Sequence, residues 1–201
     1  QSVVRERQTL VNYRYLQQQG DTINLRRQGM AVTLDGLAKG YVLDAGADEL
    51  LRHGLADVLV EAGGDLMARG MTANGGWRIG IQAPRKAVGE LLGMVQVENA
   101  ALATSGDYLN HFGGDYTQHH ILDPMTGVSP AELSSVSVLA PTACEADALS
   151  TSFMVLGADD SFAVIQQRSR VAAFVVSKHG AQYRSNNFSL YNGSANPILR
   201  Q

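Results

Sequence analysis

Apolar and polar positions alternate with a period of two in several short segments, a pattern that predicts β-strands. A polar turn at Gly20-Asp21 lies inside residues 9–34 and predicts a hairpin there, and 31–34 also has the composition of a short strand. A continuous apolar run covers 171–177 and predicts a strand buried on both faces. Further strands are expected at 57–61, 77–81, 91–97 and 182–184.

Helical spacing of apolar residues appears in three other places. The best-marked helix is predicted from Ala143 to Leu156, because Thr142 is a natural N-cap, Glu145 completes a capping box and Gly157 supplies a C-terminal stop. A helix is also expected to open at 35–41 and to stop at Gly54, and a third to run from an acidic cap at 159–161 to about Arg168.

This mixture of elements predicts an α+β protein in which mainly antiparallel sheets pack against helices. The 201 residues suffice for one sizeable domain, taken as 1–201, and 45% of them are hydrophobic, which excludes a disordered chain. A formal net charge of −3 gives no electrostatic footprint for nucleic acid or an anionic membrane. No apolar run reaches about 18 residues. The single cysteine leaves the redox compartment undecided.

Two candidate metal ligands lie on the helix predicted after Thr142. Asp147 and Thr151 are four residues apart, so their side chains share one face and offer two hard oxygen ligands of the kind that suits Mg²⁺. The alternative is an exposed aspartate and a threonine that bonds back to its own helix.

Candidate acid–base chemistry lies at His119 and His120, on a predicted strand that ends in a Pro-Met-Thr-Gly turn. Neighbouring strand residues point to opposite faces, so only one of the two histidines can face a given site. That histidine could take a proton from a hydroxyl nucleophile, with Asp123 to orient it or balance its charge. A histidine that is simply hydrogen-bonded at a strand end is the alternative.

Three glycine-containing turns are candidate ligand contacts. The turn at Gly36 with Lys39 is a suitable place to hold phosphate, although an ordinary strand-to-helix connection explains it as well. Gly63-Gly64 would let a ligand approach the main chain, or is a plain hairpin turn. The segment 104–107 offers hydroxyls and amides to a phosphate or ribose, or is a polar turn.

Taken together, these motifs resemble the ApbE family of FAD:protein FMN transferases. The order is Asp-Gly-Leu-Ala-Lys-Gly-Tyr at 35–41, Gly-Gly-Asp at 63–65, Ala-Thr-Ser-Gly-Asp-Tyr at 103–108, His-Ile-Leu-Asp-Pro-Met-Thr-Gly at 120–127 and Ala-Pro-Thr-Ala-Cys-Glu-Ala-Asp-Ala-Leu-Ser-Thr at 140–151. The resemblance covers about residues 30–157 and implies an ApbE-like fold, related to the T-fold, that binds FAD and uses Mg²⁺.

The resemblance also implies roles for individual residues. Asp147 and Thr151, with the carbonyl of Gly36, correspond to the metal ligands, and His120 corresponds to the base that activates the acceptor hydroxyl. FAD contacts are expected at Thr33, Lys39 and Ile121, with Gly63, Gly64, Ser105, Gly106 and Asp107 lining the same cleft. The implied reaction moves FMN from FAD to a Thr or Ser hydroxyl of a partner protein and releases AMP.

Two departures from the family pattern bear on this expectation. The usual Asp-Leu-Gly-Gly becomes Thr33-Leu34-Asp35-Gly36, which removes a carboxylate at 33 and places one at 35. Family members also carry a further segment ahead of this start, which includes part of the flavin pocket, so residues 1–201 are expected to be the C-terminal portion of the family domain. The first residues, with no initiator methionine, read as a processed or truncated start.

Two other functions stay open at this stage. The same site would act as an FAD pyrophosphatase, giving FMN and AMP, if water replaced the acceptor. A non-catalytic flavin-binding or assembly factor would hold flavin or a partner without turnover. By resemblance the acceptor is a flavin-carrying subunit of a membrane electron-transfer complex. The expected location is the bacterial periplasm, with lipid anchoring to the inner membrane through a segment outside this chain.

Overall fold

The computed structural model describes residues 2–87 and 89–191, and it has the predicted α+β architecture with antiparallel sheets. A six-stranded sheet in the order β12-β11-β10-β7-β4-β3 is antiparallel throughout. Its strands are β3 (Val58–Ala62), β4 (Asp65–Arg69), β7 (Ala100–Gly106), β10 (Leu133–Ala140), β11 (Ala172–Ser177) and β12 (Gln182–Arg184).

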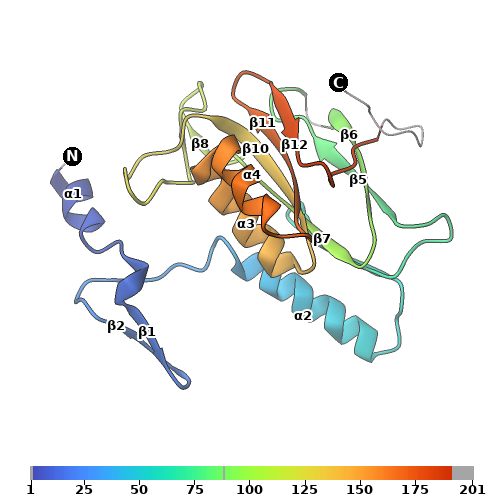
Figure 1. Cartoon of the computed structure of the whole chain (residues 1–201), viewed down its shortest axis with the longest axis horizontal. Helices are drawn as coiled ribbons and strands as arrows, with labels where there is room; N and C mark the ends of the chain where they lie inside the picture. The colour runs from blue at the N-terminus through green and yellow to red at the C-terminus, as the bar shows by residue number, and fades with distance from the viewer. Residues whose placement is uncertain (1, 88, 192–201) are drawn as a thin grey trace.

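Helices cover one face of this sheet and a β-ribbon covers the other, so its central strands are buried on both sides (Figure 1). Ala101 and Ala103 of β7 join the cluster under the helices, whereas Leu102 between them joins the cluster under the ribbon. The helices are α2 (Ala38–Arg52), α3 (Ala143–Leu156) and α4 (Ala158–Gln166), and the ribbon pairs β5 (Trp77–Gln82) with β6 (Leu91–Val97).

The N-terminal arm, residues 2–37, extends away from these layers (Figure 1). It contains α1 (Ser2–Gln8), the 3₁₀ turn η1 (Tyr13–Tyr15) and the hairpin β1 (Leu16–Gln19) to β2 (Thr22–Leu25). The predicted hairpin around Gly20-Asp21 is therefore confirmed, and Gly20 has the positive φ of 59° that its turn requires. The predicted strand at 31–34 is wrong, because this exposed segment has no strand beside it to pair with.

Local sequence signals located the best-marked helix accurately. Helix α3 begins at Ala143, its N-cap Thr142 accepts from Glu145 N, and it ends before Gly157. Helix α4 differs from the prediction: it starts at Ala158, before the acidic residues, and its first amide donates to Glu132 Oε1 at 2.9 Å. A carboxylate distant in sequence, and not the expected 159–161 cap, satisfies the helix start.

One loop prediction needs correction. The polar turn suggested as one reading of 104–107 is instead the end of β7 up to Gly106, in the centre of the sheet. In the loop between β5 and β6, Pro84 is buried and Arg85 binds the buried Asp107. After β12, Phe188 and Leu190 are buried under the ribbon.

No helix in the described part of the chain combines the length and the apolar character needed to cross a bilayer.

Candidate functional site

The site is built on the crossing of α2 and α3. Gly40 is required there, because a Cβ at this position would overlap the carbonyl oxygen of Ala143. Two carboxylates tie the helices in opposite directions. Asp44 of α2 accepts from Ala143 N at 2.7 Å and Cys144 N at 2.9 Å, and Asp147 of α3 accepts from Gly40 N at 3.0 Å. The start of α2 is thereby held against the first turns of α3.

Asp147 and Thr151 lie four residues apart on α3, and neither fits the alternative interpretation. Asp147 is only 4% exposed. Thr151 Oγ1 lies 3.0 Å from Ser105 Oγ of β7, which in turn lies 2.9 Å from Ser150 Oγ. Gly36 is adjacent, since a Cβ built on it would lie 3.5 Å from Thr151 Cγ2. The structure thus brings Gly36 to Thr151, one helical turn beyond Asp147.

The donor set in this region fits Mg²⁺ in its chemistry. It contains the Asp147 carboxylate and the hydroxyls of Ser105, Ser150 and Thr151, all hard oxygens. Among residues 2–87 and 89–191, no group of three or more His, Cys, Asp or Glu side chains is placed to hold a metal. Sites of this kind suit Mg²⁺, which commonly takes one or two carboxylates and completes its shell with water and substrate phosphates.

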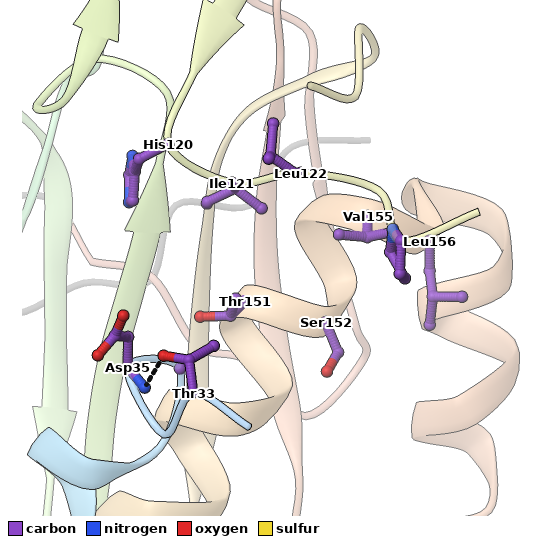
Figure 2. Close-up of a pocket in the computed structure, with 11 residues that line it drawn as sticks. Thr33, Asp35, His120, Ile121, Leu122, Thr151, Ser152, Val155 and Leu156 are labelled. Carbon is purple, nitrogen blue, oxygen red and sulfur yellow. Dashed lines mark hydrogen bonds between the residues drawn. The ribbon is translucent and has the colours of Figure 1, made fainter. Parts of the chain in front are cut away.

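A cleft of about 590 Å³ opens beside Thr151 and Gly36, a size typical of small-molecule sites. Figure 2 shows His120, Ile121 and Leu122 along one side of the space, with Thr33, Asp35 and Thr151 across from them. The lining residues are Thr33, Asp35, Gly36, His120, Ile121, Leu122, Pro124, Thr151, Ser152, Val155 and Leu156.

The two histidines separate as the strand argument required. His119 closes the short strand β9 (Gln118–His119), is 1% exposed, and donates through Nε2 to Pro130 O at 3.2 Å. Burial lowers the pKa of His119, which favours the neutral ring. His120 is exposed and faces the cleft, beyond the end of the strand on which it was predicted.

The orientation of the His120 ring determines which nitrogen is available. Its Nδ1 lies 3.2 Å from the carbonyl oxygen of Asn110, which only accepts hydrogen bonds. Nδ1 therefore carries the proton in the neutral ring, and Nε2 is the unprotonated nitrogen. Asp123 does not orient the ring as proposed, because its carboxylate accepts from Met125 N and Thr126 Oγ1 within its own turn.

Thr33 and Asp35, the two positions that depart from the usual family pattern, both lie at the cleft. Thr33 Oγ1 accepts from Asp35 N at 3.2 Å, and both residues line the cleft. In Figure 2 the carboxylate of Asp35 points toward the side on which His120 lies. A carboxylate therefore lies at the cleft in this chain, supplied by residue 35 and not by residue 33.

Lys39 does not line the cleft, and it is paired with Asp65, a carboxylate to which the sequence assigned no role. Its Nζ lies 2.5 Å from Asp65 Oδ2, and Asp65 Oδ1 accepts from Thr104 N. Burial raises the pKa of Asp65, against the lowering effect of Lys39. Asp65 directly follows Gly63-Gly64 in the quoted motif, so a signal for it was present in the sequence.

The remaining predicted contacts differ in where they lie. Gly63 and Gly64 have positive φ values of 58° and 93° in the β3–β4 turn, beside Lys39 and outside the lining of the cleft. Ser105 reaches Thr151 through its hydroxyl. Gly106 packs under the ring of Tyr108, and Asp107 is fully buried against Arg85 and Lys178, so neither lines the cleft as expected.

The comparisons with known proteins agree with the motifs. The model of the ApbE family matches residues 1–175. A FAD:protein FMN transferase of Salmonella typhimurium is 37% identical over 158 residues, which is 77% of this chain and 45% of that protein. One from Vibrio cholerae is 31% identical over 188 residues, covering 90% and 56% respectively. The chain thus spans about half the length of these curated relatives.

Solved structures match the fold as well. The ApbE protein of Thermotoga maritima superposes with a TM-score of 0.83 at 31% identity, over 92% of this chain and 61% of that one. The flavin transferase ApbE of Vibrio cholerae superposes with a TM-score of 0.80 at 30% identity, over 92% and 60%.

Proposed function

The chain belongs to the ApbE family, and from that premise we propose that it transfers FMN from FAD to a Thr or Ser hydroxyl of an acceptor protein, with release of AMP. The names of the similar proteins, FAD:protein FMN transferase, support the flavin transfer. The chain covers only part of each of them, so the activity of the whole protein is a proposal for this one.

One observation carries the proposal. His120 presents an unprotonated Nε2 at a cleft whose opposite side is formed by Thr151 and Gly36. A base on one side and a set of hard oxygens that would hold Mg²⁺ on the other is the arrangement needed to activate a hydroxyl beside a pyrophosphate.

In the proposed reaction the acceptor hydroxyl enters from the side of His120. Nε2 takes its proton as the oxygen bonds to the FMN phosphorus, and the bond from that phosphorus to the AMP phosphate breaks. Asp147, Thr151 and the carbonyl of Gly36 would hold Mg²⁺, which when bound neutralises charge on the pyrophosphate. Ile121, Leu122 and Val155 line the same cleft with apolar surface, which is suited to exclude water.

The acceptor is proposed to be a flavin-bearing subunit of a membrane electron-transfer complex, met in the periplasm. This rests on the family resemblance. Hydrolysis is the second candidate, and it is favoured by one observation: His120 is exposed, so water can reach Nε2 when no acceptor is docked. The pyrophosphatase reaction would then give FMN and AMP.

The test incubates the chain with FAD and Mg²⁺, with and without a peptide carrying Ser/Thr-Gly-Ala-Ser/Thr. AMP release and peptide mass are followed. We expect the peptide to gain the mass of an FMN group, and His120→Ala to lower the rate by about 10²- to 10⁴-fold. His53→Ala is the matched control, since His53 is exposed at the end of α2 and contacts Glu49.

Three results would change this conclusion. AMP without peptide modification would identify the pyrophosphatase. AMP release that is equal in His120→Ala and the control would exclude His120 as the base. Binding of FAD without AMP release, in both the presence and the absence of a chelator, would leave the binding factor as the function.

A further inference from the structure

The loop that carries His120 is attached at its base to a buried ion cluster. Asp107 comes directly after β7 and is 0% exposed. Arg85 grips its carboxylate with two parallel bonds, Nη1 to Oδ1 at 2.8 Å and Nη2 to Oδ2 at 2.7 Å. Lys178 Nζ lies 3.4 Å from Oδ2. Two cations from separate parts of the chain thus bind one carboxylate. That carboxylate belongs to the first residue of the 107–120 loop.

Both cations also contact Tyr116, which lies in the second half of this loop. Lys178 Nζ donates to the carbonyl oxygen of Tyr116 at 2.6 Å, and the Arg85 guanidinium lies 4.1 Å from the centre of the Tyr116 ring. Tyr116 has a φ of 58°, a conformation unusual for a side chain of this size. The cluster holds the backbone in this conformation by contacts to both its carbonyl and its ring.

From Tyr116 the constraint continues to the candidate base. The two-residue strands β8 (His111–Phe112) and β9 pair with each other, with His111 opposite His119. The carbonyl of Asn110 then accepts from both His120 N, at 3.0 Å, and His120 Nδ1. The ring orientation of His120 depends on where Asn110 lies, and Asn110 is three residues after Asp107.

We propose that Asp107 is a positioning residue that, through Arg85 and Lys178, fixes the 107–120 loop and so aims Nε2 of His120 into the cleft. The inference rests on the proposed function for its catalytic meaning. It replaces the expectation that Asp107 touches FAD, because a fully buried carboxylate already bound to two cations has no oxygen facing the cleft.

The first experiment detects which ring nitrogen of His120 carries the proton, and it does not require the protein to be active. In a long-range ¹H–¹⁵N correlation spectrum at mildly alkaline pH, wild-type His120 is expected to show the Nδ1–H form. In Asp107→Asn and Lys178→Met its signals are expected to move toward the average of the two tautomers. His120→Ala assigns the resonance among the five histidines of the chain.

The second experiment separates positioning from FAD contact. Asp107→Asn and Lys178→Met are expected to lower kcat for AMP release by about 10- to 100-fold, as small misplacements of a reacting group do. The dissociation constant of FAD, measured by quenching of flavin fluorescence, is expected to stay unchanged. Lys178→Arg keeps a cation and is expected to recover most of the rate.

Lys86→Met is the matched control, because Lys86 neighbours Arg85 but is paired with Glu90 on the surface. If Asp107→Asn does not fold, Lys178→Met and its Arg counterpart carry the test alone. A weaker affinity for FAD with an unchanged His120 spectrum would overturn the proposal in favour of direct contact. An unchanged spectrum and unchanged kcat would overturn it outright. If wild type has no activity, the spectrum alone decides between these outcomes, and only the proposed function fails.

Discussion

Most apolar side chains are exposed in the N-terminal arm, residues 2–37, and many are buried in the layered body, residues 38–87 and 89–191. No residue from 4 to 37 is buried, and Ile23 and Leu34 of the arm are 53% and 56% exposed. In the body, Phe153 of α3 is completely buried. Both regions have regular secondary structure, so the difference teaches that a strand pattern can be satisfied locally without contributing a core.

The candidate site contains residues from both the arm and the body. The wall formed by α3 is anchored by buried carboxylates and hydroxyls, whereas Thr33, Asp35 and Gly36 come from the end of the exposed arm. The arm also contacts the body at the turn after His120, where Gln8 Nε2 donates to Met125 O at 2.9 Å. The side of the cleft that faces His120 therefore joins residues of the buried body, on α3, to the end of an arm in which no residue from 4 to 37 is buried.

The largest expected effect sharpens the contrast in burial. Phe153→Ala should lower the free energy of unfolding by about 3–5 kcal/mol, because it removes a fully buried ring between α3 and the sheet. Ile23→Ala in the arm should change it by less than about 0.5 kcal/mol. Urea denaturation of both variants measures this, and similar losses from the two would mean that the arm has a core of its own.

A smaller effect is expected within the body, at two glycines of the same helix. Gly40→Ala should destabilise by about 2–3 kcal/mol, since its Cβ would meet the backbone of Ala143 where α2 crosses α3. Gly46→Ala has ordinary contact with Val60 at 3.7 Å and should stabilise by about 0.5–1 kcal/mol through helix propensity. Thermal unfolding compares the pair, and equal shifts would contradict the close crossing.

The smallest effect in energy is local opening of the arm. Trypsin should cut first after Arg14, Arg26 or Arg27, which are all exposed, because opening there disrupts almost no buried contact. Lys178, only 13% exposed and held in the ion cluster, should be cut late. Mass spectrometry of the first fragments tests this order, and simultaneous cleavage at both places would remove the distinction between the regions.

Much of the fold was predictable because its signals are local. The cap at Thr142, the stop at Gly157 and the turn at Gly20 each act within a few residues, and each element was found in its expected place. The strand predicted at 31–34 failed for lack of a neighbour, and β7 was partly mistaken for a turn because small polar residues can also lie in a buried strand. Strand formation depends on partners that periodicity does not reveal.

The sequence by itself determined which residues could do chemistry: the spacing of Asp147 and Thr151, the adjacency of His119 and His120, and the order of the motifs. Only the tertiary structure decided how they are used. It buried His119, turned His120 to the cleft, joined Asp147 to Gly40 across 107 positions and paired Asp107 with Arg85 and Lys178. The physical reason is that a carboxylate binds whichever donors the fold brings near it once water is excluded, and chain separation has no part in that choice.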